Sequence, residues 1–124
     1  MLPPIILSIA GSDCSGGAGI QADIKTISAL GGYAASVITA VTAQNTLGVQ
    51  SVYPIPVDMV KAQITSVMDD LRPDAVKIGM VYDAGIVTTI VDCLQTYTPE
   101  CIVYDPVMIC LLYTSPSPRD LSTS

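Results

Sequence analysis

A glycine-rich segment, Gly11–Gly19 (GSDCSGGAG), is the part of this 124-residue chain whose residue types most clearly suggest chemistry. It follows an apolar run and precedes a helical pattern, so its backbone N–H groups would lie at a helix N-terminus, where anions and polar ligands bind. A P-loop is excluded because no lysine precedes Lys25. The relaxed dinucleotide pattern Gly17-x-Gly19-x-x-Ala22 fits, but no acidic residue follows at the spacing that holds a ribose. The segment is long for a purely structural turn, which favours ligand contact.

Four side chains outside this segment could also take part in a site. Asp23 falls in the first turn of the predicted helix, where it would either contact a ligand or stabilise the helix dipole. Gln44 follows an apolar strand, and its amide could bind the mixed edge of a heterocycle or cap a loop. Lys77 lies inside a predicted buried strand, which indicates an ion pair or a place at the sheet's edge. Asp105 ends the last predicted strand, where it could bind Mg²⁺ or cap the strand.

Composition excludes several classes of function. The chain has no histidine, so Ser-His-Asp and Cys-His catalysis and histidine-ligated metal sites are ruled out within it. Eleven acidic and five basic residues give a net charge of −6, which leaves no basic stripe for nucleic acid. The cysteines show no C-x-x-C spacing, so we expect free thiols in a reducing compartment. With no visible signal peptide and no apolar run of membrane-spanning length, we expect a cytoplasmic protein that does not associate with membranes.

Apolar runs and helical patterns alternate along the chain, and these elements must position the side chains above. Strands are predicted at 4–10, 33–42, 51–55, 75–80 and 101–105, and helices at 20–31, 57–71 and 84–95. This alternation predicts an α/β fold, a mostly parallel sheet with helices on both faces. Such sheets bind ligands outside the carboxyl ends of their strands. We therefore expect one cleft lined by four segments: Gly11–Gly19, Thr42–Gly48, Gly79–Met80 and Asp105–Met108.

The last residues, 111–124, continue none of these patterns. They are rich in Ser, Thr and Pro, and the string CLLYTSPSPRD resembles the translation of a common sequencing-library adapter. We therefore expect residues 1–110 to form the folded part and residues 111–124 to be a non-native, disordered tail, with Cys110 at the boundary. A natural disordered tail is the alternative.

Longer motifs carry a resemblance to a known family. Residues 10–23 (AGSDCSGGAGIQAD) and 37–46 (VITAVTAQNT) closely resemble motifs of hydroxymethylpyrimidine/phosphomethylpyrimidine kinases. Residues 77–80 (KIGM) and 105–108 (DPVM) match the same family, in the same order. The resemblance covers residues 5–109. It implies a ribokinase-like fold and ATP-dependent phosphorylation of the pyrimidine precursor of thiamine, first at its hydroxymethyl group and then on the resulting phosphate.

The same resemblance implies which residues form the pyrimidine pocket: Gly11, Asp23, Gln44, Met80 and Val107. Gln44 would hydrogen-bond the pyrimidine edge, and Met80 and Val107 would pack against the ring. Asp105 would lie on the phosphate and Mg²⁺ side, without a direct metal ligand being expected in the chain. Cys14 stands where the family often has proline, a change that should affect the stiffness of the loop more than its chemistry.

Family members are roughly twice this length, so one domain would be only half encoded here. The ATP site, the glycine-rich anion hole and the catalytic base would lie outside this chain, so we predict no catalytic residue in it and no activity of the chain alone. Full-length relatives often form homodimers. We also expect the sheet to stop at strand 101–105 with an open edge, which would leave the chain marginally stable and poorly soluble.

Two other functions stay open. The chain could be a non-catalytic module that binds a pyrimidine through Gly11–Gly19 and Gln44. It could also belong to a pyridoxal-type kinase of the same superfamily. The continuous match through residues 44–46 (QNT) favours the pyrimidine.

Overall fold

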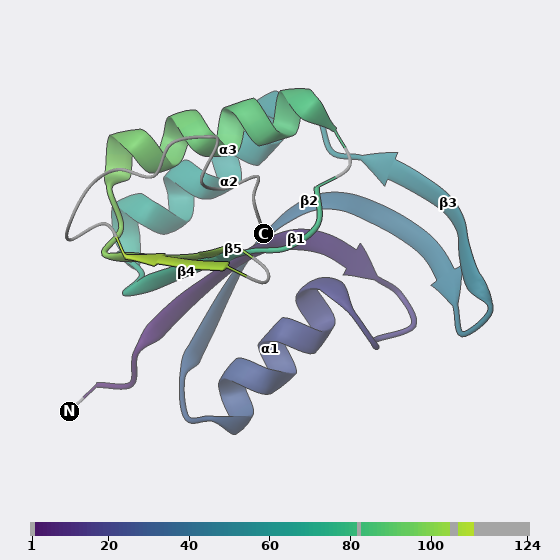
Figure 1. Cartoon of the computed structure of the whole chain (residues 1–124), viewed down its shortest axis with the longest axis horizontal. Helices are drawn as coiled ribbons and strands as arrows, with labels where there is room; N and C mark the ends of the chain where they lie inside the picture. The colour runs from purple at the N-terminus through teal and green to yellow at the C-terminus, as the bar shows by residue number, and fades with distance from the viewer. Residues whose placement is uncertain (1, 82, 105–106, 111–124) are drawn as a thin grey trace.

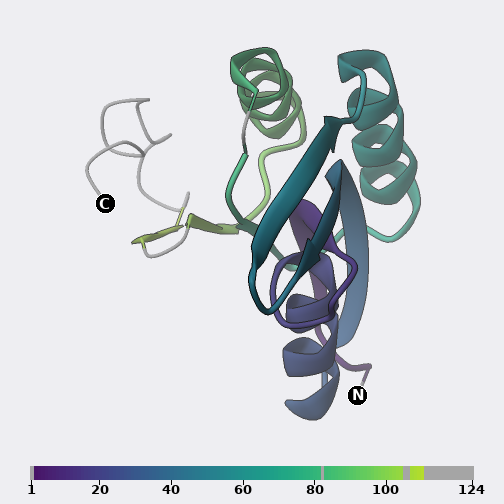
Figure 2. The same cartoon turned by 90° about the vertical axis from the view of Figure 1, so that its right-hand side faces the viewer.

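The computed structural model describes residues 2–81, 83–104 and 107–110. They form one six-stranded sheet in the order β3-β2-β1-β4-β5-β6, with helices on both faces (Figures 1 and 2). The elements are β1 (Ile5–Asp13), α1 (Gly19–Ala29), β2 (Tyr33–Asn45), β3 (Gly48–Pro54), α2 (Val57–Asp70), β4 (Ala75–Ile78), α3 (Ala84–Tyr97), β5 (Cys101–Tyr104) and β6 (Val107–Cys110). The four inner strands pair in parallel, whereas β3 and β6 pair antiparallel at the two edges. The predicted α/β fold with a mostly parallel sheet is therefore confirmed.

The main core lies between the sheet and the helices α2 and α3, which cover the same face (Figure 1). Leu7 and Ile9 alternate along β1 and are fully buried against these helices. Burying an aliphatic side chain of this size contributes about 1.5–3 kcal/mol, so the buried side chains of this layer stabilise the fold. Its buried residues are Leu7, Ile9, Val37, Val60, Ile64, Met68, Val76, Ile78, Ile86, Ile90, Cys93, Leu94 and Ile102. Within the described part of the chain, no helix is both long and apolar enough to cross a membrane.

The opposite face of the sheet, covered by α1, is polar at its centre. Ser8 of β1 pairs in register with Lys77 of β4, and Ser8 is fully buried. Ile20 is the buried residue of α1. The face of the sheet covered by α1 therefore carries buried polar side chains, whereas the face covered by α2 and α3 carries the hydrophobic core.

The loops after β1 and β2 are shorter than the sequence indicates. Residues Ser12 and Asp13 pair with Val41 and Thr42, which extends β1 into the glycine-rich segment. The prediction of a loop at Gln44 is wrong, because β2 runs to Asn45 and Gln44 pairs antiparallel with Val49 of β3. The cause is the hairpin partner, which converts a polar segment into a strand.

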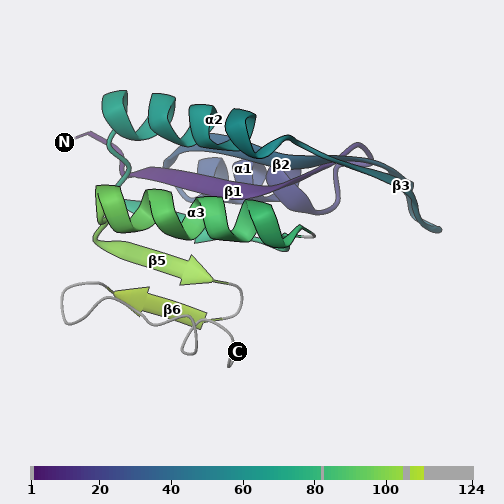
Figure 3. The ribbon, with the colours of Figure 1, turned by 90° about the horizontal axis from the view of Figure 1, so that it is seen from above.

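The predicted open edge at strand 101–105 is also wrong. The strand β6 pairs antiparallel with β5, with Tyr104 opposite Val107 and Cys101 opposite Cys110 (Figure 3). Among the described strands, β3 and β6 are therefore the edges. Asp105 and the predicted tail, 111–124, lie outside the described residues.

The end of the β2–β3 hairpin extends beyond the helices as an arm (Figures 1 and 3). We call residues 41–54 the hairpin arm. Every residue of β3 is exposed, and Tyr53 leaves 65% of its surface open. Val41, Leu47 and Val49 are exposed as well. The arm thus combines an edge strand with uncovered apolar side chains.

Candidate functional site

A cavity of about 290 Å³ lies at the carboxyl ends of β1, β2 and β4. It is lined by Ala10, Gly11, Ser12, Asp13, Ala18, Gly19, Thr42, Gln44, Val49, Lys77, Gly79 and Met80. Three of the four segments expected to line one cleft therefore meet there. The fourth, Asp105–Met108, lies partly outside the described residues.

Asp13 organises the loop at the mouth of this cavity. Its Oδ1 accepts hydrogen bonds from the backbone N–H of Ser15 at 2.8 Å and the hydroxyl of Ser15 at 2.7 Å, and its Oδ2 accepts from the N–H of Ala18 at 2.7 Å. The Ser15 hydroxyl, helped by the backbone N–H groups, lowers the pKa of the Asp13 carboxyl, although burial acts in the opposite direction. Sequence reasoning did not single out Asp13; the signal was an aspartate two residues before a serine, the pattern of an Asx turn.

The loop returns onto β1 at Gly19, which has a φ of +60° and forms a bridge with Ser12. A Cβ at Gly19 would collide with the carbonyl oxygen of Gly11, so the close approach requires glycine. Gln21 of α1 fastens the same junction. Its Oε1 accepts from the N–H of Asp13 at 2.8 Å, and its Nε2 donates to Ser12 Oγ at 2.8 Å.

Gln44 is held at the cavity by both its backbone and its side chain. The Cys14 thiol accepts from the Gln44 N–H at 3.3 Å and donates to the Gln44 carbonyl at 3.1 Å. The buried hydroxyl of Thr42 lies 2.7 Å from Gln44 Oε1 and 2.8 Å from the Ser12 carbonyl oxygen. The Gln44 amide nitrogen has no partner among the described residues, so it is able to donate to a ligand.

Asp23 and Lys77 form an ion pair beside the cavity. Lys77 Nζ donates to Asp23 Oδ2 at 2.9 Å and to Oδ1 at 3.1 Å, and Ser8 Oγ donates to Oδ2 at 2.6 Å. The ion pair predicted for Lys77 is confirmed, whereas the alternative at the sheet's edge is wrong, because β4 lies between β1 and β5. Lys77 lines the cavity, but Asp23 is not among its lining residues.

Two other residues expected in the pocket, Gly11 and Met80, line the cavity. The surface of Met80 is 71% exposed. Val107 begins β6, and its side chain lies outside the described part, as does Asp105. Ligand contact by Gly11, Asp23, Gln44, Met80 and Val107 thus stays a prediction.

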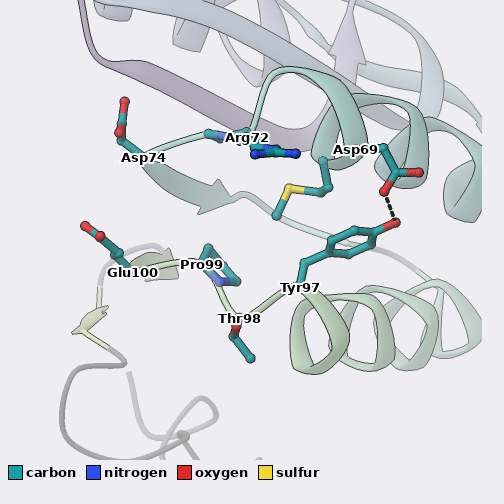
Figure 4. A pocket seen from close by; sticks show the side chains of 9 residues that line it. Asp69, Arg72, Asp74, Tyr97, Thr98, Pro99 and Glu100 are labelled. Atoms are coloured by element: carbon teal, nitrogen blue, oxygen red, sulfur yellow. Dashed lines mark hydrogen bonds between the residues drawn. The ribbon is translucent and has the colours of Figure 1, made fainter.

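A second cavity, of about 470 Å³, lies at the opposite end of the sheet, around the start of β4 and β5 (Figure 4). Its wall includes Tyr97, whose hydroxyl donates to Asp69 Oδ1 at 2.8 Å, and this bond raises the pKa of Tyr97. Asp74 and Glu100 add further acidic groups. Because parallel sheets bind ligands at the carboxyl ends of their strands, the smaller cavity is the candidate site.

Comparison with known proteins shows the family of the chain. Residues 13–116 match a family model described as phosphomethylpyrimidine kinase. The chain belongs to the phosphomethylpyrimidine kinase family. The matched range includes the first residues of segment 111–124, whose foreign origin stays a prediction.

Three relatives show how far the similarity reaches. The hydroxymethylpyrimidine/phosphomethylpyrimidine kinase of Escherichia coli is 57% identical over 103 residues, which cover 83% of this chain and 39% of the relative. The crystal structure of phosphomethylpyrimidine kinase from Clostridium difficile 630 matches with 51% identity and a TM-score of 0.81, covering 95% of this chain and 52% of that one. The pyridoxal kinase of Staphylococcus aureus in complex with AMP-PCP matches with 34% identity and a TM-score of 0.77, covering 90% and 41%.

These matches confirm the predicted family and the ribokinase-like fold. They also show that the chain spans about two fifths to one half of the length of these relatives. The candidate site is therefore one part of the proteins to which the chain is similar.

Proposed function

We propose that this chain forms the pyrimidine-binding part of a kinase of thiamine biosynthesis. The enzyme would use ATP to phosphorylate 4-amino-5-hydroxymethyl-2-methylpyrimidine at its hydroxymethyl group and then phosphorylate the monophosphate. The observation that carries this proposal is the cavity at the carboxyl ends of β1, β2 and β4, with the Gln44 amide in its wall. Its volume of about 290 Å³ suits a small heterocycle.

The Gln44 amide would recognise the substrate's edge. A 4-aminopyrimidine places a donor amino group next to an acceptor ring nitrogen, and an amide offers the complementary acceptor and donor. The Thr42 hydroxyl and the Cys14 thiol restrict the movement of Gln44, which lowers the entropy lost on binding. Met80 would cover the ring with its polarisable thioether, Val107 would pack on it, and Gly11 would let the backbone approach it.

ATP use is supported by the family and by a structural neighbour solved in complex with AMP-PCP. We propose Mg²⁺ as the metal that accompanies ATP. Among the described residues, no group of three or more Cys, Asp or Glu side chains could hold a metal ion, so we assign none of them to Mg²⁺. Asp105 stays the predicted residue on the phosphate and Mg²⁺ side. The anion hole and the catalytic base are expected in a segment that this chain does not supply.

We further propose that the intact enzyme is a cytoplasmic homodimer that acts on small molecules and binds neither nucleic acid nor membranes. The net charge of −6 disfavours binding to the phosphate backbone of nucleic acid.

A chimera tests the kinase proposal. Residues 1–104 of this chain would be joined to the part of the Escherichia coli relative that follows the residue aligned with Tyr104, because 57% identity favours compatible packing. We expect the chimera to phosphorylate hydroxymethylpyrimidine with MgATP, and its Gln44→Ala variant to lose most of this activity. If the chimera folds but does not phosphorylate the pyrimidine, while the Escherichia coli enzyme is active in the same assay, the proposal is contradicted. Calorimetric binding of the pyrimidine without turnover would instead support the non-catalytic binding module.

Pyridoxal is the second candidate substrate, because pyridoxal kinases share this fold at 33–34% identity. The identity to the pyrimidine kinases is higher, at 51–57% in the relatives compared above. We expect the chimera to use hydroxymethylpyrimidine in preference to pyridoxal. The ratio of the two kcat/KM values measures this preference.

A further inference from the structure

Lys77 supplies the positive charge of the candidate cavity. It is the one lysine or arginine among the described residues that line the cavity. Its side chain keeps 26% of its surface accessible. A Cβ added at Gly79 would lie 3.3 Å from Lys77 Nζ, so the glycine leaves the ammonium group room beside the cavity.

The ion pair with Asp23 does not use all of the ammonium group's donors. An ammonium group has three N–H bonds, and the two contacts to Asp23, at 2.9 and 3.1 Å, occupy at most two of them. Ser8 adds a 2.6 Å bond to the carboxylate, which keeps Asp23 in place. No further partner of Lys77 occurs among the described residues. One donor is thus available to a molecule in the cavity.

The nearby carboxylates make this donor important for an anionic ligand. The buried carboxylate of Asp13 lines the cavity, and its oxygens accept from the Ser15 and Ala18 groups of the loop. Asp23 adds a second negative charge behind Lys77. A phosphate that entered without a cation would be repelled by both carboxylates, since charges in a partly desolvated site interact strongly.

We propose that Lys77 binds the phosphate group of the phosphorylated pyrimidine and so lets one cavity accept both the alcohol and its monophosphate. This inference rests on the proposed function. With the alcohol bound, Lys77 stays paired with Asp23. With the monophosphate bound, its free N–H donates to a phosphate oxygen while Asp23 holds the ammonium group in position. Lys77 is thus a residue that determines specificity for the second substrate.

The test measures by calorimetry the affinity of the 124-residue chain for hydroxymethylpyrimidine and for its monophosphate. We expect Lys77→Met to weaken monophosphate binding by about tenfold to a hundredfold more than alcohol binding, because a hydrogen bond to a charged group is lost. Asp23→Asn should shift the ratio the other way, towards the monophosphate, because it removes a competing negative charge without a change in size. Lys77→Arg should largely keep the wild-type ratio.

Lys61→Met is the matched control. Lys61 is an exposed residue of α2, on the opposite face of the sheet, and does not line the cavity. An equal fall in the ratio of monophosphate affinity to alcohol affinity in Lys61→Met would show a general charge effect and overturn the inference. An unchanged ratio in Lys77→Met would overturn it as well.

Folding and function are separated by two further readouts. If Lys77→Met does not give the wild-type circular dichroism spectrum, the isosteric Asp23→Asn variant tests the inference instead. A ratio of monophosphate affinity to alcohol affinity that stays constant or falls in Asp23→Asn overturns the inference. If the wild-type chain and the chimera bind neither ligand, the proposed function itself fails. If they bind the alcohol but discriminate equally in all variants, only the role of Lys77 fails.

Discussion

Thr42 connects the two strands that shape the candidate site. Its hydroxyl lies within hydrogen-bond distance of both Ser12 and Gln44, so we expect Thr42→Val to free the Gln44 amide without a change in side-chain shape. Pyrimidine binding should weaken by about tenfold, which corresponds to about one hydrogen bond. Calorimetry with hydroxymethylpyrimidine gives the affinity, and equal affinities of variant and wild type would contradict this role.

Thr39→Val is the control on the same strand. The Thr39 Oγ1 is buried and has no hydrogen-bond partner within the described part of the chain. Replacing this hydroxyl by a methyl group removes a desolvated polar atom, so we expect the free energy of unfolding to rise by about 1 kcal/mol. Pyrimidine affinity should not change. Chemical denaturation of both variants separates the stability effect from the binding effect.

Asp13 makes the loop sensitive to acid. Its pKa is lowered in the folded chain by the Ser15 hydroxyl and the loop N–H groups. A carboxyl group whose pKa is lowered on folding stabilises the folded chain at pH values above its ordinary pKa of about 4. This stabilisation is lost as the pH falls through the folded-state pKa. We therefore expect Asp13→Asn to be less stable than wild type at pH 7, and the difference to shrink below about pH 4. Urea titrations across this range would detect it; a difference independent of pH would refute it.

The sequence predicts the role of a single residue where that role depends on its neighbours in the chain. A lysine in an apolar strand indicated an ion pair, and Lys77 has one. Its partner, Asp23, lies 54 positions away in the chain, and only the packing of α1 on the sheet brings the two together. The bonds from Ser15 to Asp13 are local, yet the glycine-rich segment around them predicts a role for the backbone N–H groups and not for this carboxylate.

At the scale of elements, α3 depends on a cap that can be tested directly. The Asp83 side chain accepts from the N–H groups of Gly85 at 2.7 Å and Ile86 at 3.2 Å. An N-cap of this kind contributes about 1 kcal/mol, so Asp83→Ala should lower the free energy of unfolding by that amount. Asp92→Ala, at an exposed position within α3, should have little effect. Equal losses in the two variants would mean that charge, not capping, is responsible.

The alternation of apolar runs was enough to predict the inner strands and all three helices, because burial on a fixed face imposes a period on the sequence. Helix α2 shows this well, with Val60, Ile64 and Met68 buried as their spacing predicts. The strand ends were not predictable in the same way. Gln44 belongs to β2 because it pairs with β3, and β6 is a strand because it pairs with β5. Pairing of this kind leaves no periodic pattern in the sequence of the segment that becomes a strand.

At the scale of the whole molecule, the hairpin arm (residues 41–54) is a surface through which chains could associate. It joins an edge strand to uncovered apolar side chains, a combination that promotes association. We expect the wild-type chain to associate as its concentration rises, and Tyr53→Lys to reduce this association, because a charge on an edge strand opposes pairing. Light scattering at several concentrations measures the effect.

Tyr33→Lys is the matched control for the arm. Tyr33 is 52% exposed at the start of β2, away from the residues that pair with β3. It should leave association unchanged. If both lysine variants reduce scattering alike, net charge and not the arm governs the behaviour of the chain.

The close approach of Gly19 to the carbonyl oxygen of Gly11 has a consequence for genetics. Glycine alone lacks a Cβ, so every missense change at codon 19 introduces the same collision, whatever the new side chain. Codon 19 should therefore tolerate synonymous changes only. If codon 19 of the chimera is varied and the variants are selected for growth without thiamine, every missense change, Gly19→Ala included, should be depleted.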